Sequence, residues 1–210
     1  GTRNWLKDNI SSGDLFDVHA ALRLKPGTEP LLALGYEYRD AQVRFIRTLP
    51  PITGGFGHAS IEGRTYTLVL DSGTVKPPMG GAIDVLDAVF SVPDITEKPA
   101  SADITMRTES SLTAALSLLD EPPFRFMTKA DRPVDLGEGH AQLVTNLSLP
   151  LRNGVMPGDV DYNVTGTLTE VASEKLVPGK RLTADALSLE ATPKGLRIAG
   201  AGKIGAVPFE

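Results

Sequence analysis

Three histidines are the residues of this sequence best suited to acid–base or metal chemistry, and their positions favour neither. His19, His58 and His140 lie far apart in the chain and form no short metal-binding motif such as H-E-x-x-H. Cysteine is absent from the sequence, which removes thiolate nucleophiles and cysteine-ligated zinc. We therefore expect no metal site and no cofactor, and we interpret the histidines as surface or hydrogen-bonded residues.

Two pairs of neighbouring carboxylates could serve as an acid and a base, but the composition argues against that role. Asp84 lies near Asp87, and Asp120 precedes Glu121. In a chain with 26 acidic residues, such pairs are expected on a solvated surface. The sequence also lacks the G-x-S-x-G motif of a serine hydrolase. We predict that the chain is not an enzyme and has no catalytic residues.

Two glycine-rich runs resemble nucleotide-binding loops only in the spacing of their glycines. Residues 200–205 fit the pattern G-x-G-x-x-G, but a dinucleotide site needs a following helix and no helical pattern follows here. Residues 54–57, Gly-Gly-Phe-Gly, lack the lysine that would reach a phosphate. We predict that the second run is a turn that leads into a strand.

The charge of the chain limits its partners. With 21 basic and 26 acidic residues, the net charge is −5, which provides no basic surface for nucleic acid.

No stretch reaches the ~18 apolar residues that cross a bilayer, and the N-terminal residues do not resemble a signal peptide. We expect residues 1–210 to be a single β-rich segment cut from a longer protein, whose missing flanks could hold a membrane anchor.

Apolar and polar residues alternate with period two along much of the chain, which is typical of strands with one wet face. Five segments show the alternation clearly, at residues 18–25, 65–71, 102–109, 141–149 and 159–168. Weaker strand candidates are residues 32–38, 43–49, 56–61, 83–92, 182–191 and 196–204. Short turns, such as Thr-Pro-Lys-Gly at 192–195, predict that neighbouring strands pair antiparallel.

The parity of the alternation changes within residues 83–92. Ile83 and Val85 share one parity, whereas Leu86, Ala88 and Phe90 share the other. Either a bulge shifts the register there, or both faces of this strand are buried.

Two short segments favour helix. Ser111 could cap a helix over residues 111–119, in which Leu112, Leu116 and Leu119 share one side before a Pro-Pro pair ends it. Residues 3–10 could form a second helix. We predict a mainly β fold, an elongated and curved antiparallel sheet in the form of an open groove or half-barrel of hairpins, with one or two short helices.

One or two helices are too few to cover the apolar face of such a sheet. The other half of the same sheet would cover it in a sandwich or barrel, whereas an external apolar ligand would fill an open groove. Alternation does not separate these alternatives. The residues that would line the groove, or belong to an ordinary closed core, are Val18, Leu22, Leu24, Tyr66, Leu68, Leu70, Ile104, Met106, Leu143, Leu147, Leu149, Val160, Tyr162 and Val164.

Several spaced motifs between residue 5 and about residue 170 are more particular than composition. They are Trp5-Leu6 with Asn9-Ile10 and Gly13, Leu49-Pro50-Pro51-Ile52 with Gly54, Gly55 and Gly57, Ala115-Leu116-Ser117-Leu118-Leu119 before Pro122-Pro123, and Gly137, Gly139 and Leu147-Ser148-Leu149-Pro150-Leu151. In this order they resemble the YhdP-type central domain of unknown function in the AsmA-like superfamily of bacterial envelope proteins.

The resemblance implies a periplasmic segment of a long protein that is anchored in the inner membrane through a region outside this chain. Members of the superfamily look like bridges for lipid transport, in which an apolar trough of strands carries phospholipid acyl chains towards the outer membrane. The residues of the groove would then face lipid, and the partners would be phospholipid, or another apolar ligand, and the flanking segments of the same chain. The alternative is a structural or protein-binding module whose strand edges pair with neighbouring segments.

Overall fold

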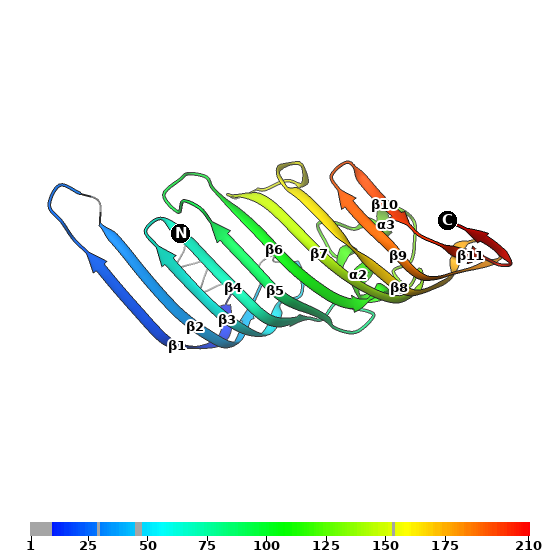
Figure 1. Cartoon of the computed structure of the whole chain (residues 1–210), viewed down its shortest axis with the longest axis horizontal. Coiled ribbons are helices and arrows are strands. Elements are labelled where there is room, and N and C mark those ends of the chain that lie inside the picture. The colour runs from blue at the N-terminus through cyan, green and yellow to red at the C-terminus, as the bar shows by residue number, and fades with distance from the viewer. Residues whose placement is uncertain (1–9, 29, 45–47, 153) are drawn as a thin grey trace.

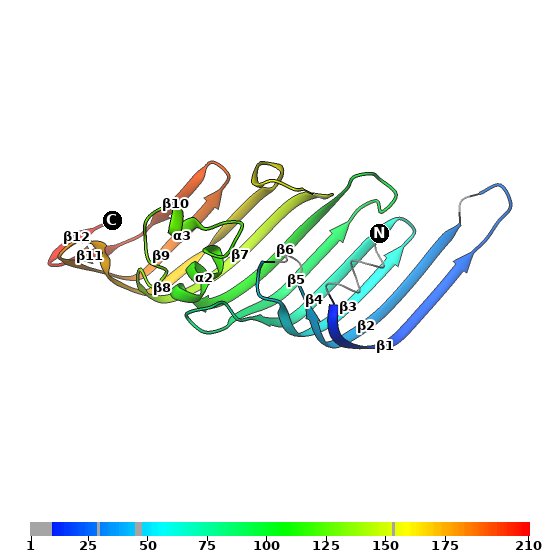
Figure 2. The same cartoon turned by 180° about the vertical axis from the view of Figure 1, so that it is seen from behind.

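One open antiparallel sheet makes up most of the chain. The computed structural model describes residues 10–28, 30–44, 48–152 and 154–210. In these residues twelve strands follow the order β1-β2-β3-β4-β5-β6-β7-β8-β9-β11-β12, with β10 also paired to β9. Figures 1 and 2 show an elongated sheet whose first and last strands lie far apart, so it does not close. The predicted fold class is confirmed.

The strands follow one another as hairpins, and each pairs with its neighbour in sequence up to β9. They are β1 Ile10–Arg23, β2 Leu31–Val43, β3 Ile52–Glu62, β4 Thr65–Val75, β5 Ile83–Val92, β6 Ala100–Ser111, β7 Glu138–Leu151, β8 Asp161–Val177, β9 Lys180–Thr192, β10 Gly195–Ala199, β11 Gly202–Ile204 and β12 Val207–Phe209. The helices are α2 Leu112–Leu119 and α3 Phe126–Lys129, with a 3₁₀ turn η1 at Pro157–Asp159.

Strand pairing separates the alternating residues onto two sides of the sheet. Leu68 pairs with Phe90, Phe90 with Ile104, and Ile104 with Leu147. Because directly paired residues lie on the same side, these four define what we call the apolar face. The other side, the polar face, carries a neighbouring row of paired residues, namely Thr67, Ser91, Asp103, Ser148 and Asp161.

Bulges cross β2 to β5 and keep the apolar residues on one side. Register shifts occur around Asp40, Gly54 and Asp87, and all three residues have positive φ, at 51°, 61° and 48°. The bulge at Asp87 accounts for the change of parity in β5, because Val85 and Ala88 pack in the same core cluster on either side of it. Of the two alternatives left open by the sequence, the structure has the bulge.

Helix α2 forms where the sequence predicts it. The Ser111 hydroxyl accepts a hydrogen bond from the Ala114 amide at 3.0 Å and donates one to the Gly80 carbonyl at 2.7 Å. The Met79 amide donates to the buried Ser117 hydroxyl at 3.1 Å. These bonds attach the helix to the loop between β4 and β5, over one end of the apolar face.

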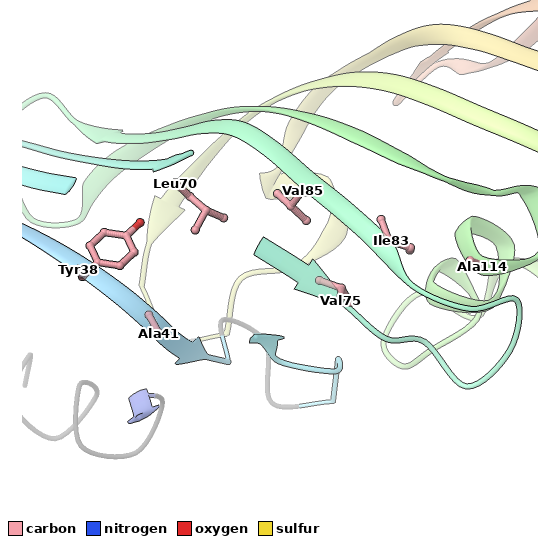
Figure 3. Packing of buried hydrophobic residues seen from close by; sticks show 7 residues of the cluster. All are labelled: Tyr38, Ala41, Leu70, Val75, Ile83, Val85 and Ala114. Carbon is pink, nitrogen blue, oxygen red and sulfur yellow. The ribbon is translucent and has the colours of Figure 1, made fainter. Parts of the chain in front are cut away.

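Two core clusters lie on the apolar face beneath this region. The first contains Tyr38, Ala41, Leu70, Val75, Ile83, Val85 and Ala114, which come from β2, β4, β5 and α2 (Figure 3). The second contains Ala141, Leu168, Val171, Leu182, Ala184 and Leu187 from β7 to β9, with Leu112 of α2 packed against it. Helix α2 therefore touches both clusters, and Figure 2 shows it in front of the sheet together with α3.

Three of the expectations for strands and turns differ from the structure. A strand over 43–49 is wrong in the described residues, because β2 ends at Val43 and prolines 50 and 51 offer no amide for pairing. Residues 54–57 lie inside β3 rather than in a turn before it. The strand predicted at 196–204 is interrupted after Ala199, although β10 and β11 both pair with β9.

Two further points concern helices other than α2. The helix predicted at 3–10 falls on residues outside the described ones, except that Ile10 begins β1. Helix α3 was not predicted, because its four residues are too few to show a helical period.

Candidate functional site

The residues considered for acid–base chemistry lie apart on the surface of the sheet. His19 and His58 are exposed, and His140 Nε2 lies 3.7 Å from Glu170 Oε2 in an exposed pair. Asp87 forms an ion pair with Arg107 at 3.2 Å on the polar face. Within the described ranges, no group of three or more His, Asp or Glu residues could hold a metal ion.

The Asp120 carboxylate connects the two helices. Its carboxylate accepts hydrogen bonds from the Thr128 amide at 2.7 Å and the Thr128 hydroxyl at 2.8 Å. These hydrogen bonds hold the pKa of Asp120 below its usual range because they favour the charged form, and the bond from the Thr128 backbone amide is the largest cause. The carboxylate thus ties the end of α2 to α3.

The apolar face carries a continuous row of aliphatic and aromatic side chains across seven strands. Each residue in the row pairs directly with the next, so the row runs perpendicular to the strands. From β2 to β8 the row consists of Tyr36, Ala59, Leu68, Phe90, Ile104, Leu147 and Tyr162. We call it the central row. All its members except Ala59 are only half-buried, so their side chains remain accessible from the apolar face.

A second row continues the apolar face towards the β1–β2 hairpin. Ala20 pairs with Leu34, Leu34 with Ile61, Ile61 with Tyr66, and Tyr66 with Val92. Beyond it, Leu22 pairs with Leu32. Exposure rises towards the edge strand, where Leu22 keeps 61% of its surface exposed. On the same face at the opposite end of the sheet, Ile198 of β10 is also exposed.

The fourteen residues predicted to line the groove fall into three groups by exposure. Leu70 is buried in the first core cluster, and Val18, Leu22 and Leu24 are exposed at the β1–β2 hairpin. The others are half-buried, namely Tyr66, Leu68, Ile104, Met106, Leu143, Leu147, Leu149, Val160, Tyr162 and Val164. Leu24 and Val160 lie just outside strands β1 and β8. Leu68 and Met106 also pack against the first cluster, and Leu143 against the second.

Several residues of the same face were not singled out from the sequence. They are Leu32, Leu34, Tyr36, Ile61, Phe90, Leu189 and Ile198. Their segments were recognised as strands, but the weaker alternation there did not say which side each residue takes. Only the hairpin register, which is a pairing between two segments, places them on the apolar face.

Small residues of β3 let tyrosines of β2 lie across the sheet. The Tyr38 hydroxyl donates to the Val69 carbonyl of β4 at 2.7 Å and passes over Gly57. A Cβ at residue 57 would lie 2.0 Å from the Val69 oxygen and 2.9 Å from the Tyr38 hydroxyl. Glycine is therefore required at this crossing. Burial is the main reason that the pKa of Tyr38 lies well above its usual value.

Two depressions in the described part of the sheet are open to solvent, and the larger is lined by residues of both faces. The larger, about 570 Å³, is lined by Asp103, Ile104, Thr105, Asn146, Leu147, Ser148, Asp161, Tyr162, Asn163, Thr192, Pro193 and Lys194. The smaller, about 340 Å³, lies at the β1–β2 hairpin beside Leu22 and Leu32. Neither is an enclosed pocket of the kind that surrounds a small substrate.

The fold and the site define a class, an open antiparallel sheet with one apolar face that its own helices cover only at one end. Comparisons of the chain with protein-family models, curated proteins and solved structures found no match. Among the described residues, no helix has the length and apolar composition needed to cross a bilayer.

Proposed function

We propose that this chain is a non-enzymatic segment of a periplasmic, AsmA/YhdP-like lipid-transfer protein, in which the apolar face holds the acyl chains of phospholipids. The observation that carries the proposal is the central row, a line of aliphatic and aromatic side chains, all half-buried except Ala59, that crosses seven strands without interruption by a charge. The membrane anchor and the route between the two membranes belong to regions outside this chain.

The size of the central row suits an acyl chain. Six strand spacings of about 4.8 Å give a row of roughly 29 Å, and one leaflet of a bilayer has a hydrocarbon depth of about 15 Å. Each methylene removed from water contributes about 0.8 kcal/mol. Many weak contacts of this kind hold a chain while letting it slide along the row, which is what transport requires.

The first test is to identify what the chain carries. The protein is purified gently, examined by native mass spectrometry, and extracted with organic solvent for lipid analysis. Phospholipid at about one molecule or more per chain is the expected result. A protein that carries none, and takes up none from phosphatidylethanolamine vesicles, would contradict the proposal.

Charged substitutions on the two faces provide a matched comparison. Leu22→Glu with Leu32→Glu places two carboxylates on exposed positions of the apolar face, whereas Val89→Glu with Val144→Glu places two on exposed positions of the polar face. We expect only the first pair to lower bound lipid. These positions are preferable to Leu68 and Leu143, which pack against the core clusters and whose substitution could unfold the chain.

A protein-binding module is the second candidate, and strand β1 favours it. β1 has 14 residues, nearly all of them exposed, and no described residue pairs with its outer edge. An unpaired edge of this length can take up another strand. A dimer that forms with rising concentration and contains no lipid, measured by analytical ultracentrifugation, would favour this function over lipid binding.

A further inference from the structure

A pair of tyrosine hydroxyls interrupts the apolar face at one place. The Tyr36 and Tyr66 hydroxyl oxygens lie 3.4 Å apart, reaching towards each other from β2 and β4 across β3. Both side chains are half-buried, and the Tyr66 ring packs edge-on against Phe90 at 6.2 Å. The pair therefore sits where the central row meets the row of Leu34, Ile61 and Tyr66.

The hydrogen bonding of this pair is incomplete. Two hydroxyls bring two protons, and one proton at most lies between the two oxygens. No described residue accepts the second proton. The 3.4 Å separation is also longer than the 2.5–3.0 Å typical of O–H···O bonds. Tyr38, in contrast, has its proton donated to the Val69 carbonyl at 2.7 Å.

The Tyr66 hydroxyl remains a neutral donor. Burial is the largest cause that raises the pKa of Tyr66, and its bond to Tyr36 adds to this, so the phenol stays protonated well above physiological pH. An oxygen placed beside the pair would find one or two converging O–H groups in surroundings that are otherwise apolar. Hydrogen bonds made there are stronger than in water.

We propose that the Tyr36 and Tyr66 hydroxyls form a recognition point for the ester carbonyl oxygen of an acyl chain that lies along the central row. This inference rests on the proposed function. A carbonyl oxygen has two lone pairs and so can accept from both tyrosines, while the hydrocarbon tail continues over Phe90, Ile104 and Leu147. The pair gives the apolar face one fixed position for the polar end of a lipid.

The test compares an ester with a hydrocarbon of equal chain length. The protein is incubated with an equimolar mixture of methyl dodecanoate and dodecane, passed through gel filtration and extracted, and the two compounds are measured by gas chromatography. In Tyr36→Phe with Tyr66→Phe, we expect the retained ester-to-alkane ratio to fall about fivefold, equivalent to one net hydrogen bond of about 1 kcal/mol. The ratio is internal to each sample, so it does not depend on how much protein is folded.

Tyr38→Phe is the matched control, because it loses the same hydroxyl from a buried residue of the first core cluster, where that hydroxyl already donates to the Val69 carbonyl. An unchanged ratio in this variant, with a lowered ratio in the double variant, supports the recognition point. Equal ratios in the wild type and the double variant, with both compounds retained, would overturn the recognition point alone. If the wild type retains neither compound, the proposed function fails and the recognition point fails with it.

Discussion

The end of the sheet under α2 and the β1–β2 hairpin have the same alternating sequence but differ in what covers them. Under α2, Ile83 and Val75 keep only 4% and 7% of their surface exposed, whereas Val18 and Leu22 of the hairpin keep 56% and 61%. Alternation assigns a residue to a face of the sheet. Whether that face is a core or a surface depends on a segment far away in the sequence, here α2 and the loop before β5.

This difference in burial means that the residues under α2 contribute to stability, whereas the exposed residues of the hairpin are available for binding. Residues under α2 are packed on both sides and contribute to the folded state through burial. The hairpin residues gain little from folding, yet an exposed apolar patch marks a place where another molecule binds. Substitutions at the two ends should therefore affect different measurements, and the predictions below test this from the largest effect to the smallest.

The largest effect is expected from a charge under α2. Ile83→Asp places a carboxylate in the first core cluster, where Ile83 keeps only 4% of its surface exposed, and should lower the free energy of unfolding by about 3 kcal/mol or more. Leu22→Asp, on the same face but exposed, should change it by less than about 0.5 kcal/mol. Urea denaturation followed by circular dichroism measures both. Equal losses would mean that the hairpin is as much a part of the core as the residues under α2.

The next effect concerns the region between the two ends, where Tyr38 crosses β3. Gly57→Ala would place a methyl group 2.0 Å from the Val69 carbonyl oxygen, so the strands must separate, and we expect a loss of about 2–3 kcal/mol. Gly35→Ala is the matched control, because a methyl group there has no neighbour within 4 Å and its cost should be near zero or slightly favourable. Thermal unfolding of both variants gives the comparison. A mild effect at residue 57 would show that the crossing can relax.

Much of the fold follows from the sequence, because its signals are local. Period-two alternation predicted the main strands, short turns predicted their antiparallel pairing, and Ser111 with the leucines after it predicted α2. The residues of the central row at Leu68, Ile104 and Leu147 were also recognised. Each of these features depends on a few neighbouring residues, so a single sequence contains it.

The rest depends on contacts between distant segments. The register that places Tyr36 beside Tyr66 is a relation among three strands, and no single segment encodes it. The bulges at Asp40 and Asp87 could have been predicted from one feature, because aspartate adopts positive φ more readily than most residues. That feature is weak, because an aspartate in a strand is usually an ordinary polar residue of the solvent face. The sequence therefore predicted the apolar face, but not the juxtaposition of Tyr36 and Tyr66 on it.

A smaller effect is expected from the cap of α2. Ser111→Ala removes the acceptor of the Ala114 amide and the donor to the Gly80 carbonyl, and should cost about 1 kcal/mol. Because α2 covers only one end of the apolar face, hydrogen exchange should rise in α2 and in the loop before β5, while the β1–β2 hairpin keeps its wild-type rates. Ser12→Ala, in the edge strand, serves as the control. Faster exchange throughout the sheet would contradict a cover that acts locally.

The smallest effect is the acid sensitivity of the junction between α2 and α3. Thr128 hydrogen bonds hold the pKa of Asp120 below its usual range, so the folded-state pKa is lower than the unfolded one, at about 3.9. The stabilisation by this carboxylate is therefore complete above that unfolded value and is lost as pH falls through the folded pKa. In Asp120→Asn the amide oxygen still accepts a hydrogen bond but carries no charge. The difference in urea midpoint between wild type and variant should shrink between pH 6 and pH 2, and a difference that stays constant would mean that the ionised form of Asp120 contributes nothing to holding α3 against α2.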